Sequence, residues 1–110
     1  PQALALYADA VPEEFVSSVE NALLSEDVEP VSLSMTVYAY EAFLKRGKRR
    51  NEILSEIRRR WGRMTDLGVD TFWETDHGAS AFGGIGSLCH GWSAVPVYIL
   101  SKYFSQNGCS

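Results

Sequence analysis

The sequence predicts an all-α protein built from antiparallel helical hairpins. Apolar side chains recur at three- and four-residue spacings through most of the 110 residues. Residues typical of helix ends, among them Pro12, Pro30 and Gly47, fall between these periodic stretches. No stretch alternates apolar and polar side chains over more than a few residues, so we expect no β-strands.

The first two periodic stretches predict a short hairpin. Residues 3–8 carry an apolar stripe typical of the tail of a helix, whose start we expect to lie before Pro1. Pro12 suits the first turn of the second helix, and the acidic pair 13–14 follows it, where carboxylates favour the helix dipole. Glu29-Pro30 is expected to end that helix.

The middle of the chain predicts two longer helices. Residues 32–46 are apolar on nearly every face, which is typical of a helix buried on more than one side. Gly47 suits the left-handed position that follows such a helix. The fourth helix is amphipathic, and its apolar stripe consists of Ile53, Leu54, Ile57, Trp61 and Met64.

The basic residues concentrate in this middle part, because nine of the ten Lys and Arg lie between Lys45 and Arg63. We interpret them as a solvated helix face, on which Glu52 and Glu56 are expected to contact Arg59 and Arg60, with Glu56 one turn before both. Nucleic-acid binding is the alternative, but no aromatic side chains are interleaved on the polar face.

Residues 67–86 predict a long glycine-rich loop, and residues 87–104 a fifth helix. Ser87 suits the N-cap of this helix, and Pro96 inside it predicts a kink. Cys89 is then expected in the first turn, too far from Cys109 beyond the helix for a disulfide within this element.

Composition excludes several classes of protein. Hydrophobic residues make up 45% and charged residues 22%, which is ordinary for a folded domain and excludes disorder. The net charge of −4 gives no cationic surface for nucleic acid or membrane, and no apolar run approaches the length of a bilayer span. We expect no cofactor.

The long loop concentrates chemically useful side chains in Thr71-Phe72-Trp73-Glu74-Thr75-Asp76-His77. A carboxylate beside an indole suits acid–base chemistry on a sugar, and aromatic rings can stack on a pyranose. The alternative is a surface loop whose aspartate caps a helix.

A second group follows in Gly86-Ser87-Leu88-Cys89-His90-Gly91-Trp92-Ser93. On the first turn of the fifth helix, His90 would project toward the long loop, where an imidazole can bond a hydroxyl group. A structural histidine bonded to the backbone is the alternative. We expect no metal site, because Asp76-His77 and Cys89-His90 are adjacent pairs whose side chains point apart and whose spacing fits no common zinc pattern.

Three motifs in one order resemble the end of the catalytic barrel of α-L-rhamnosidase-type glycoside hydrolases. Gln2 to Leu6 followed by Val11-Pro12-Glu13-Glu14 is similar to the family's T-Q-x-A-L-A-L … L-V-P-E-E hairpin. Thr71-Phe72-Trp73-Glu74 is similar to its T-T-x-W-E segment, and Ser87-Leu88-Cys89-His90, with Pro96 further on, to its S-L-x-H start of the final helix.

The resemblance implies a barrel of six helical hairpins, of which residues 1–110 are the C-terminal portion. It implies Glu74 as the general base of an inverting hydrolase, and Trp73 and His90 as sugar contacts, to which we add Asp76, His77 and Trp92 as candidate substrate-binding residues. The general acid would come from hairpins outside this chain, and a secreted or periplasmic location is favoured.

This sequence departs from the family at two places: Cys89 stands where many relatives have Asn, and residues 76–86 are short and glycine-rich. Both departures bear on which sugar is bound, so a related deoxy or uronic sugar stays open. A non-catalytic helical interaction module is the rival function, although we find no internal repeat.

For the chain by itself we expect no hydrolysis, because the partner acid is missing. Five helices in barrel order leave the stripes Leu33/Val37/Tyr40 and Leu88/Trp92/Ile99 incompletely covered. We therefore expect self-association, or a collapsed bundle that covers these faces differently.

Overall fold

The computed structural model describes residues 1–25 and 30–105, and every regular element in these ranges is helical. The longer elements are α1 (Gln2–Tyr7), α2 (Glu13–Leu23), α3 (Thr36–Leu44) and α4 (Arg50–Asp66). The shorter ones are α5 (Ala81–Gly84), α6 (Val95–Ile99), the 3₁₀ turns η1 (Leu33–Met35), η2 (Gly78–Ser80) and η3 (Gly91–Ser93), and the π-helical turn η4 (Leu100–Phe104). The predicted all-α class is confirmed.

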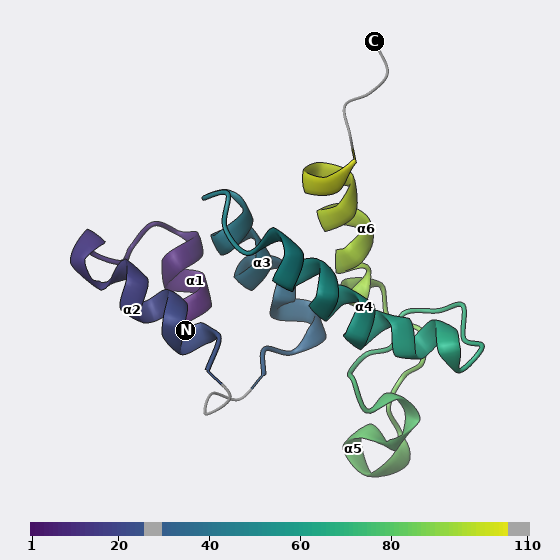
Figure 1. Cartoon of the computed structure of the whole chain (residues 1–110). Helices are drawn as coiled ribbons and strands as arrows, with labels where there is room; N and C mark the ends of the chain where they lie inside the picture. The colour runs from purple at the N-terminus through teal and green to yellow at the C-terminus, as the bar shows by residue number, and fades with distance from the viewer. Residues whose placement is uncertain (26–29, 106–110) are drawn as a thin grey trace.

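Helix α3 is the centre of the arrangement. It packs against α1, α4 and α6, and α1 also packs against α2. In Figure 1, α1 and α2 lie on one side of α3, while α6 rises on the other side behind the end of α4. The predicted burial of this segment is confirmed, since residues 40–44 are all buried. The barrel of six hairpins stays a prediction.

The helix ends follow the sequence closely. The amide of Gly47 donates to the carbonyl of Leu44 at 2.9 Å, and that of Lys48 to Phe43 at 3.0 Å. This is a Schellman motif around a glycine with φ of +70°, as predicted for the end of α3. Gly68 ends α4 in the same way, because it also has a left-handed backbone and its amide donates to Thr65.

The amphipathic fourth helix is also confirmed. Ile53, Ile57, Trp61 and Met64 are buried, and they belong to a core cluster with Leu33, Tyr40, Phe43, Leu44, Trp73, Val95 and Ile99. The helix begins earlier than the stripe alone indicated, at Arg50, with Arg49 in a left-handed conformation before it.

The predicted fifth helix over residues 87–104 is wrong in its first half. His90 is extended, with φ of −137° and ψ of 114°, and the α-helical part begins only at Val95. Pro96 therefore lies in the first turn, where its missing N–H breaks no helical hydrogen bond, so the reason for expecting a kink there no longer applies. Ser87 is no helix cap either; its hydroxyl oxygen accepts the Cys89 amide in a local turn.

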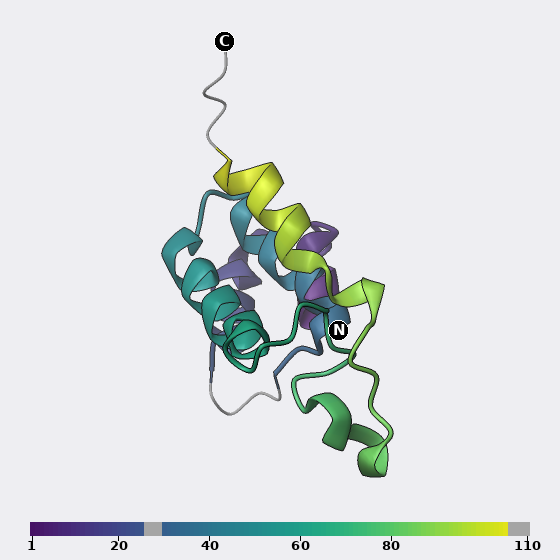
Figure 2. The ribbon, with the colours of Figure 1, turned by 90° about the vertical axis from the view of Figure 1, so that its right-hand side faces the viewer.

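The segment between α4 and α6 extends out from the packed helices and then returns to them. Figures 1 and 2 both show the part that carries α5 extending away from the rest of the molecule. Two short helical turns, η2 and α5, interrupt what the sequence predicted as a continuous loop. Cys89 is an exposed free thiol, and Cys109 lies outside the described residues.

Candidate functional site

The two motif segments of the sequence lie side by side. The amide of Glu74 donates to the carbonyl of Ser87 at 2.9 Å, and the amide of His90 donates to the carbonyl of Phe72 at 2.6 Å. The Thr71 hydroxyl adds a bond to a neighbouring carbonyl of the second segment. Residues 71–74 and 87–90 therefore run antiparallel. They close the base of the projecting loop, which consists of residues 75–86.

Glu74 has a defined orientation within this pair of segments. Its Oε2 accepts the Ser87 amide at 3.1 Å, so the carboxylate is held by the same residue that its own amide contacts. Its Oε1 has no hydrogen-bond partner in residues 1–25 and 30–105. A carboxylate with one oxygen held and one available has the geometry of a general base or of a hydrogen-bond acceptor for a ligand.

Trp73 lies in the core rather than on the surface. Its side chain is only 7% exposed, and its ring covers Gly78 so closely that a Cβ there would lie 2.8 Å from the indole. The indole Nε1 has no hydrogen-bond partner among the described residues. The structure thus places Trp73 directly before Glu74 with its ring turned into the fold.

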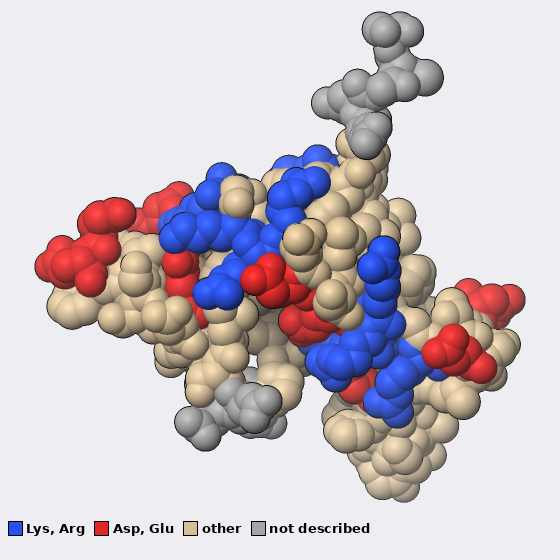
Figure 3. Space-filling model, in the orientation of Figure 1, with Lys and Arg blue, Asp and Glu red and all other residues tan. Residues whose placement is uncertain are grey.

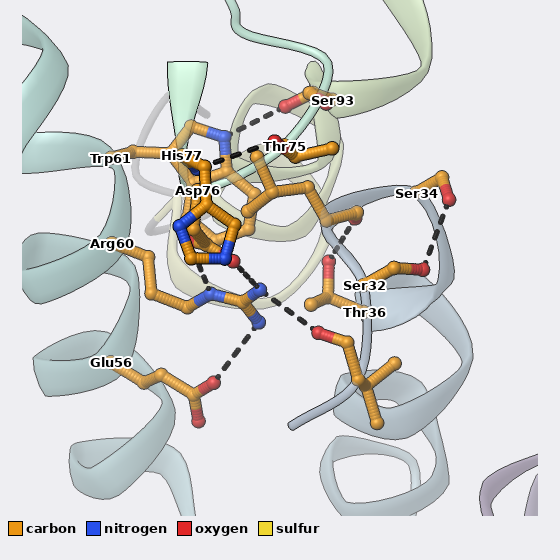
Figure 4. Close-up of polar contacts among 12 residues, drawn as sticks. Ser32, Ser34, Thr36, Glu56, Arg60, Trp61, Thr75, Asp76, His77 and Ser93 are labelled. Atoms are coloured by element: carbon orange, nitrogen blue, oxygen red, sulfur yellow. Dashed lines mark hydrogen bonds and ion pairs between the residues drawn. The ribbon is translucent and has the colours of Figure 1, made fainter. Parts of the chain in front are cut away.

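Asp76 is engaged by the fourth helix (Figure 4). The Arg60 Nε donates to its Oδ1 at 3.0 Å, and the second guanidinium nitrogen reaches Oδ2. The same guanidinium donates to the carbonyl of Val31 at 2.9 Å and contacts Glu56 at 3.4 Å. The carboxylate of Asp76 therefore fixes the projecting loop to α4, while His77 beside it is exposed.

The interpretation of the basic residues as a solvated face is wrong for Arg60. Its side chain is 3% exposed, because Asp76 and the carbonyl of Val31 replace the water that a guanidinium needs. The contact predicted between Glu56 and Arg60 is present, whereas Glu52 pairs with Arg49 at 3.6 Å instead of with Arg59.

His90 and Trp92 form an aromatic pair. Their ring centroids are 3.7 Å apart and their planes differ by 19°, so the rings are stacked. Trp92 is 51% exposed, whereas Nδ1 of His90 is buried and has no partner among the described residues. The pair therefore presents an exposed indole stacked on an imidazole whose buried Nδ1 has no partner among the described residues.

The segment from Asp76 to Ser93 is anchored to α4 by a second contact. The indole of Trp61 donates from Nε1 to the carbonyl of Ser93 at 2.8 Å, and both residues are buried. Arg60 and Trp61, neighbours on one helix, thus hold the two ends of the segment from Asp76 to Ser93. The sequence carried no signal for these pairings, because partners 16 and 32 positions apart meet only through the packing of α4.

Other kinds of site receive no support. The described residues contain no group of three His, Cys, Asp or Glu side chains placed to hold a metal ion. In the same ranges no helix has the length and apolar character to cross a membrane. Basic and acidic side chains lie next to one another over the middle of the face shown in Figure 3, so that face presents no uniform cationic surface.

Comparison of the chain with protein-family models, with curated proteins and with solved structures finds no match.

Proposed function

We propose that this chain supplies the water-activating wall of a sugar-binding site in a glycoside hydrolase of the α-L-rhamnosidase type. The substrate would be a terminal α-L-rhamnoside or a glycoside of a related deoxy sugar, cleaved with inversion. The observation that carries the proposal is the pairing of the two motif segments, which fixes the Glu74 carboxylate through the Ser87 amide at 3.1 Å.

Glu74 acts as the general base in this proposal. An inverting hydrolase needs a carboxylate that removes a proton from the attacking water, while an acid roughly 6.5–9.5 Å away protonates the leaving group. The backbone bond to Oε2 orients the carboxylate and leaves Oε1 to accept that proton. In this proposal the acid comes from another part of the intact protein.

His90 and Trp92 contact the sugar. The exposed indole of Trp92 offers a face on which an apolar side of a pyranose can stack, and the imidazole beneath it stiffens that face. The unpartnered Nδ1 of His90 is buried, so in this proposal the imidazole turns outward when the sugar binds and its Nδ1 then bonds a sugar hydroxyl. Trp73, behind Glu74, serves to hold the base rather than to stack on the substrate.

The decisive experiment changes Glu74 in a protein that contains this chain together with the preceding hairpins. Glu74→Gln retains an oxygen that accepts the Ser87 amide, so the loop keeps its shape while the base is lost. We expect kcat on a nitrophenyl α-L-rhamnoside to fall by roughly 10²–10⁴-fold. Glu14→Gln, on the exposed face of α2, is the control and should leave kcat unchanged. Full activity in Glu74→Gln would falsify the proposal, as would hydrolysis by this chain without the acid.

A non-catalytic helical interaction module is the second candidate. It is favoured by the exposed apolar side chains that follow one another along the second half of the chain, among them Phe82, Ile85, Leu88 and Val97. A module of this kind needs no carboxylate at position 74, so the Glu74→Gln comparison separates the two functions.

A further inference from the structure

The hairpin formed by α1 and α2 lies to one side of the main core (Figure 1). Every buried member of the core cluster comes from residues 33–99, and the hairpin contributes only Leu23 at the margin of that cluster. Its own buried apolar side chains, Ala3 and Leu6, are not members of the cluster. A part of a fold that shares few buried contacts with the core opens more readily than the core itself.

The junction between the hairpin and α3 is incompletely packed. A cleft of about 380 Å³ is lined on the hairpin side by Leu23 and Leu24, and a second cleft of about 350 Å³ by residues 1–4 and again by Leu23. The side chains that line such a space lack contact partners on one side, so they contribute less dispersion energy than a closed core does. Apolar packing therefore holds the hairpin only in part.

Basic side chains from the segment between α3 and α4 supply further contacts. The ammonium group of Lys45 donates to Oδ2 of Asp9 at 3.0 Å and to the carbonyl of Tyr7. The guanidinium of Arg46 donates to the other carboxylate oxygen of Asp9, and to the carbonyl of Leu6 at 3.1 Å. The end of α1 is therefore held to the end of α3 by two cations that share one carboxylate.

Asp9 lies at a position where glycine is usual. Its φ is +54°, its amide donates to the carbonyl of Leu6 at 3.3 Å, and the amide of Ala10 donates to that of Ala5 at 2.9 Å. This is a Schellman motif, in which a left-handed residue ends α1. A side chain in this conformation is less favourable than glycine, but the carboxylate makes two ion pairs that glycine could not make.

A second ion pair holds α2. The buried Glu20 accepts from the ammonium group of Lys48 at 2.9 Å and 3.2 Å, and Lys48 itself is half exposed. When the hairpin moves away from α3, both charges return to water, and their hydration offsets the loss of the pair. The contact is therefore one that breaks and forms again at modest cost.

We propose that the hairpin undocks from α3 as a unit while the core stays folded, and that the ion pairs of Asp9 and Glu20 set how often it opens. Opening removes one wall of each cleft and exposes to solvent the face of α3 that lines them. Because salt screens exposed charges, opening rises with ionic strength. The hairpin shares no residue with the segment that carries Glu74, so this inference does not rest on the proposed function.

The test is native-state hydrogen exchange of the whole chain, followed amide by amide with two-dimensional NMR. We expect the amides of α1 and α2 to share one opening constant, at least about tenfold larger than that of the amides of α4. Raising NaCl from about 0.1 M to about 1 M should increase the opening constant of the hairpin by about two- to fivefold.

Two variants show whether the ion pairs control one common opening. Asp9→Asn removes the charge but keeps a residue that tolerates the left-handed backbone, and should raise the opening constant by about two- to fivefold. Glu20→Gln keeps an acceptor for Lys48 and should raise it by about five- to tenfold. Since the hairpin opens as a unit, Asp9→Asn should also speed exchange in α2, and Glu20→Gln in α1.

Asp70→Asn is the matched control, because it makes the same change of charge at an exposed position that has no ion pair among the described residues. It should leave exchange in the hairpin unchanged. The proposal is overturned if α1 and α2 exchange as slowly as α4, if each variant affects only its own helix, or if Asp70→Asn acts like Asp9→Asn. Circular-dichroism melts show which variants fold; Asp9 is exposed, so Asp9→Asn decides the question if Glu20→Gln does not fold.

Discussion

Gly86 returns so close to Gly78 that neither position accepts a side chain. A Cβ on Gly86 would lie 2.1 Å from the carbonyl oxygen of Gly78, and a Cβ on Gly78 would lie 2.8 Å from the ring of Trp73. Gly78 also has a φ of +56°, which favours glycine. These contacts compact the projecting loop behind Glu74, so two glycines support the orientation of the candidate base.

We predict that Gly86→Ala lowers the free energy of unfolding by at least about 2 kcal/mol, because the backbone carbonyl opposite cannot move aside cheaply. The control is Gly62→Ala in the interior of α4, where nothing lies within 4 Å of the added Cβ. Gly62→Ala should raise stability by about 0.5–1 kcal/mol, the helix-propensity difference. Urea unfolding measures both; equal effects of the two alanines would contradict the close approach at Gly86.

The ion pair between Arg60 and Asp76 gives a second prediction at the scale of residues. Asp76→Asn removes one of the two carboxylates that contact a guanidinium with 3% exposure, and because Glu56 remains as the other, we expect a loss of about 1–3 kcal/mol in unfolding free energy. Asp66→Asn, on the exposed end of α4, should change stability by less than about 0.5 kcal/mol. Chemical denaturation compares the two, and near-identity of the variants would show that the pair contributes little.

At the scale of elements, a carboxylate on α3 holds the C-terminal helix. The buried Glu41 accepts at Oε1 from the hydroxyls of Tyr98 and Tyr103, each at 2.8 Å, and from the ammonium group of Lys102. The wide π turn of η4 places positions 98, 102 and 103 on one face, because its turn spans more residues than that of an α-helix. The turn is therefore fitted to a single acceptor.

This arrangement makes the free energy of unfolding depend on pH. Burial raises the pKa of the Glu41 carboxyl, but the bonds from Lys102, Tyr98 and Tyr103 outweigh burial and hold the pKa below its ordinary value. Because the pKa of Glu41 is lower in the folded protein than in the unfolded chain, its carboxylate stabilises the fold at pH values above the ordinary pKa of a glutamate. This contribution is lost as pH falls through the pKa of the folded state. Glu41→Gln should cost about 2 kcal/mol at neutral pH.

Thermal melts of the parent and of Glu41→Gln between neutral and strongly acidic pH measure this dependence. The difference between the two melting temperatures should shrink as pH falls, because the parent loses what the variant never had. Asp70→Asn, at an exposed position after α4 with no ion pair among the described residues, should follow the parent throughout. A difference that stays constant with pH would show that Glu41 is not the titrating group.

The elements that the sequence predicted well are those decided by local patterns. The apolar stripe of α4 specifies a helix, and the glycines after α3 and α4 specify where these two helices end. Each signal lies within a few residues of the feature that it specifies. The segment 87–94 was mispredicted because its conformation depends on distant partners. Phe72 accepts the His90 amide and Trp61 donates to Ser93, and these bonds hold it out of the helix that its local sequence favours.

The residues of the candidate site fall into the same two groups, those that local patterns predict and those that distant contacts place. The sequence indicated Glu74 and His90, and the structure brings their segments together through the backbone bonds between residues 71–74 and 87–90. The sequence did not indicate that Arg60 would form an ion pair with Asp76, because a run of arginines on a helix resembles a solvated face until a loop packs over it. Pairings over long sequence separations carry no periodic signal.

At the scale of the whole molecule, the chain is flat and open. It measures 44 by 43 by 20 Å, and its radius of gyration is 15.1 Å, compared with about 13 Å expected for a compact domain of this length. The stripe with Leu33 and Tyr40 is nevertheless covered, as is Ile99, whereas Leu88 and Trp92 remain exposed. Among the described residues, eight of the twelve exposed large apolar side chains lie in the second half of the chain, and the other four, Leu4, Phe15, Leu24 and Met35, lie in the first half.

We predict that the chain associates with itself through the exposed apolar side chains of its second half. Ile85 is 82% exposed and Val97 61%, and apolar exposure of this kind is relieved when two copies bury it against each other. Sedimentation velocity at rising concentration should show species larger than the monomer. The double variant Ile85→Lys/Val97→Lys should shift the chain to a monomer, because burying two ammonium groups opposes the contact.

The matched control is Ser80→Lys/Ser101→Lys, which adds the same charge at exposed polar positions of the same part of the chain and should leave association intact. If the control dissociates equally, net charge rather than the apolar surface governs the assembly. A parent chain that sediments as a monomer at all concentrations and binds no hydrophobic dye would show that the exposed side chains do not associate. Because the charge added by both double variants is identical, the difference between them isolates the apolar contact.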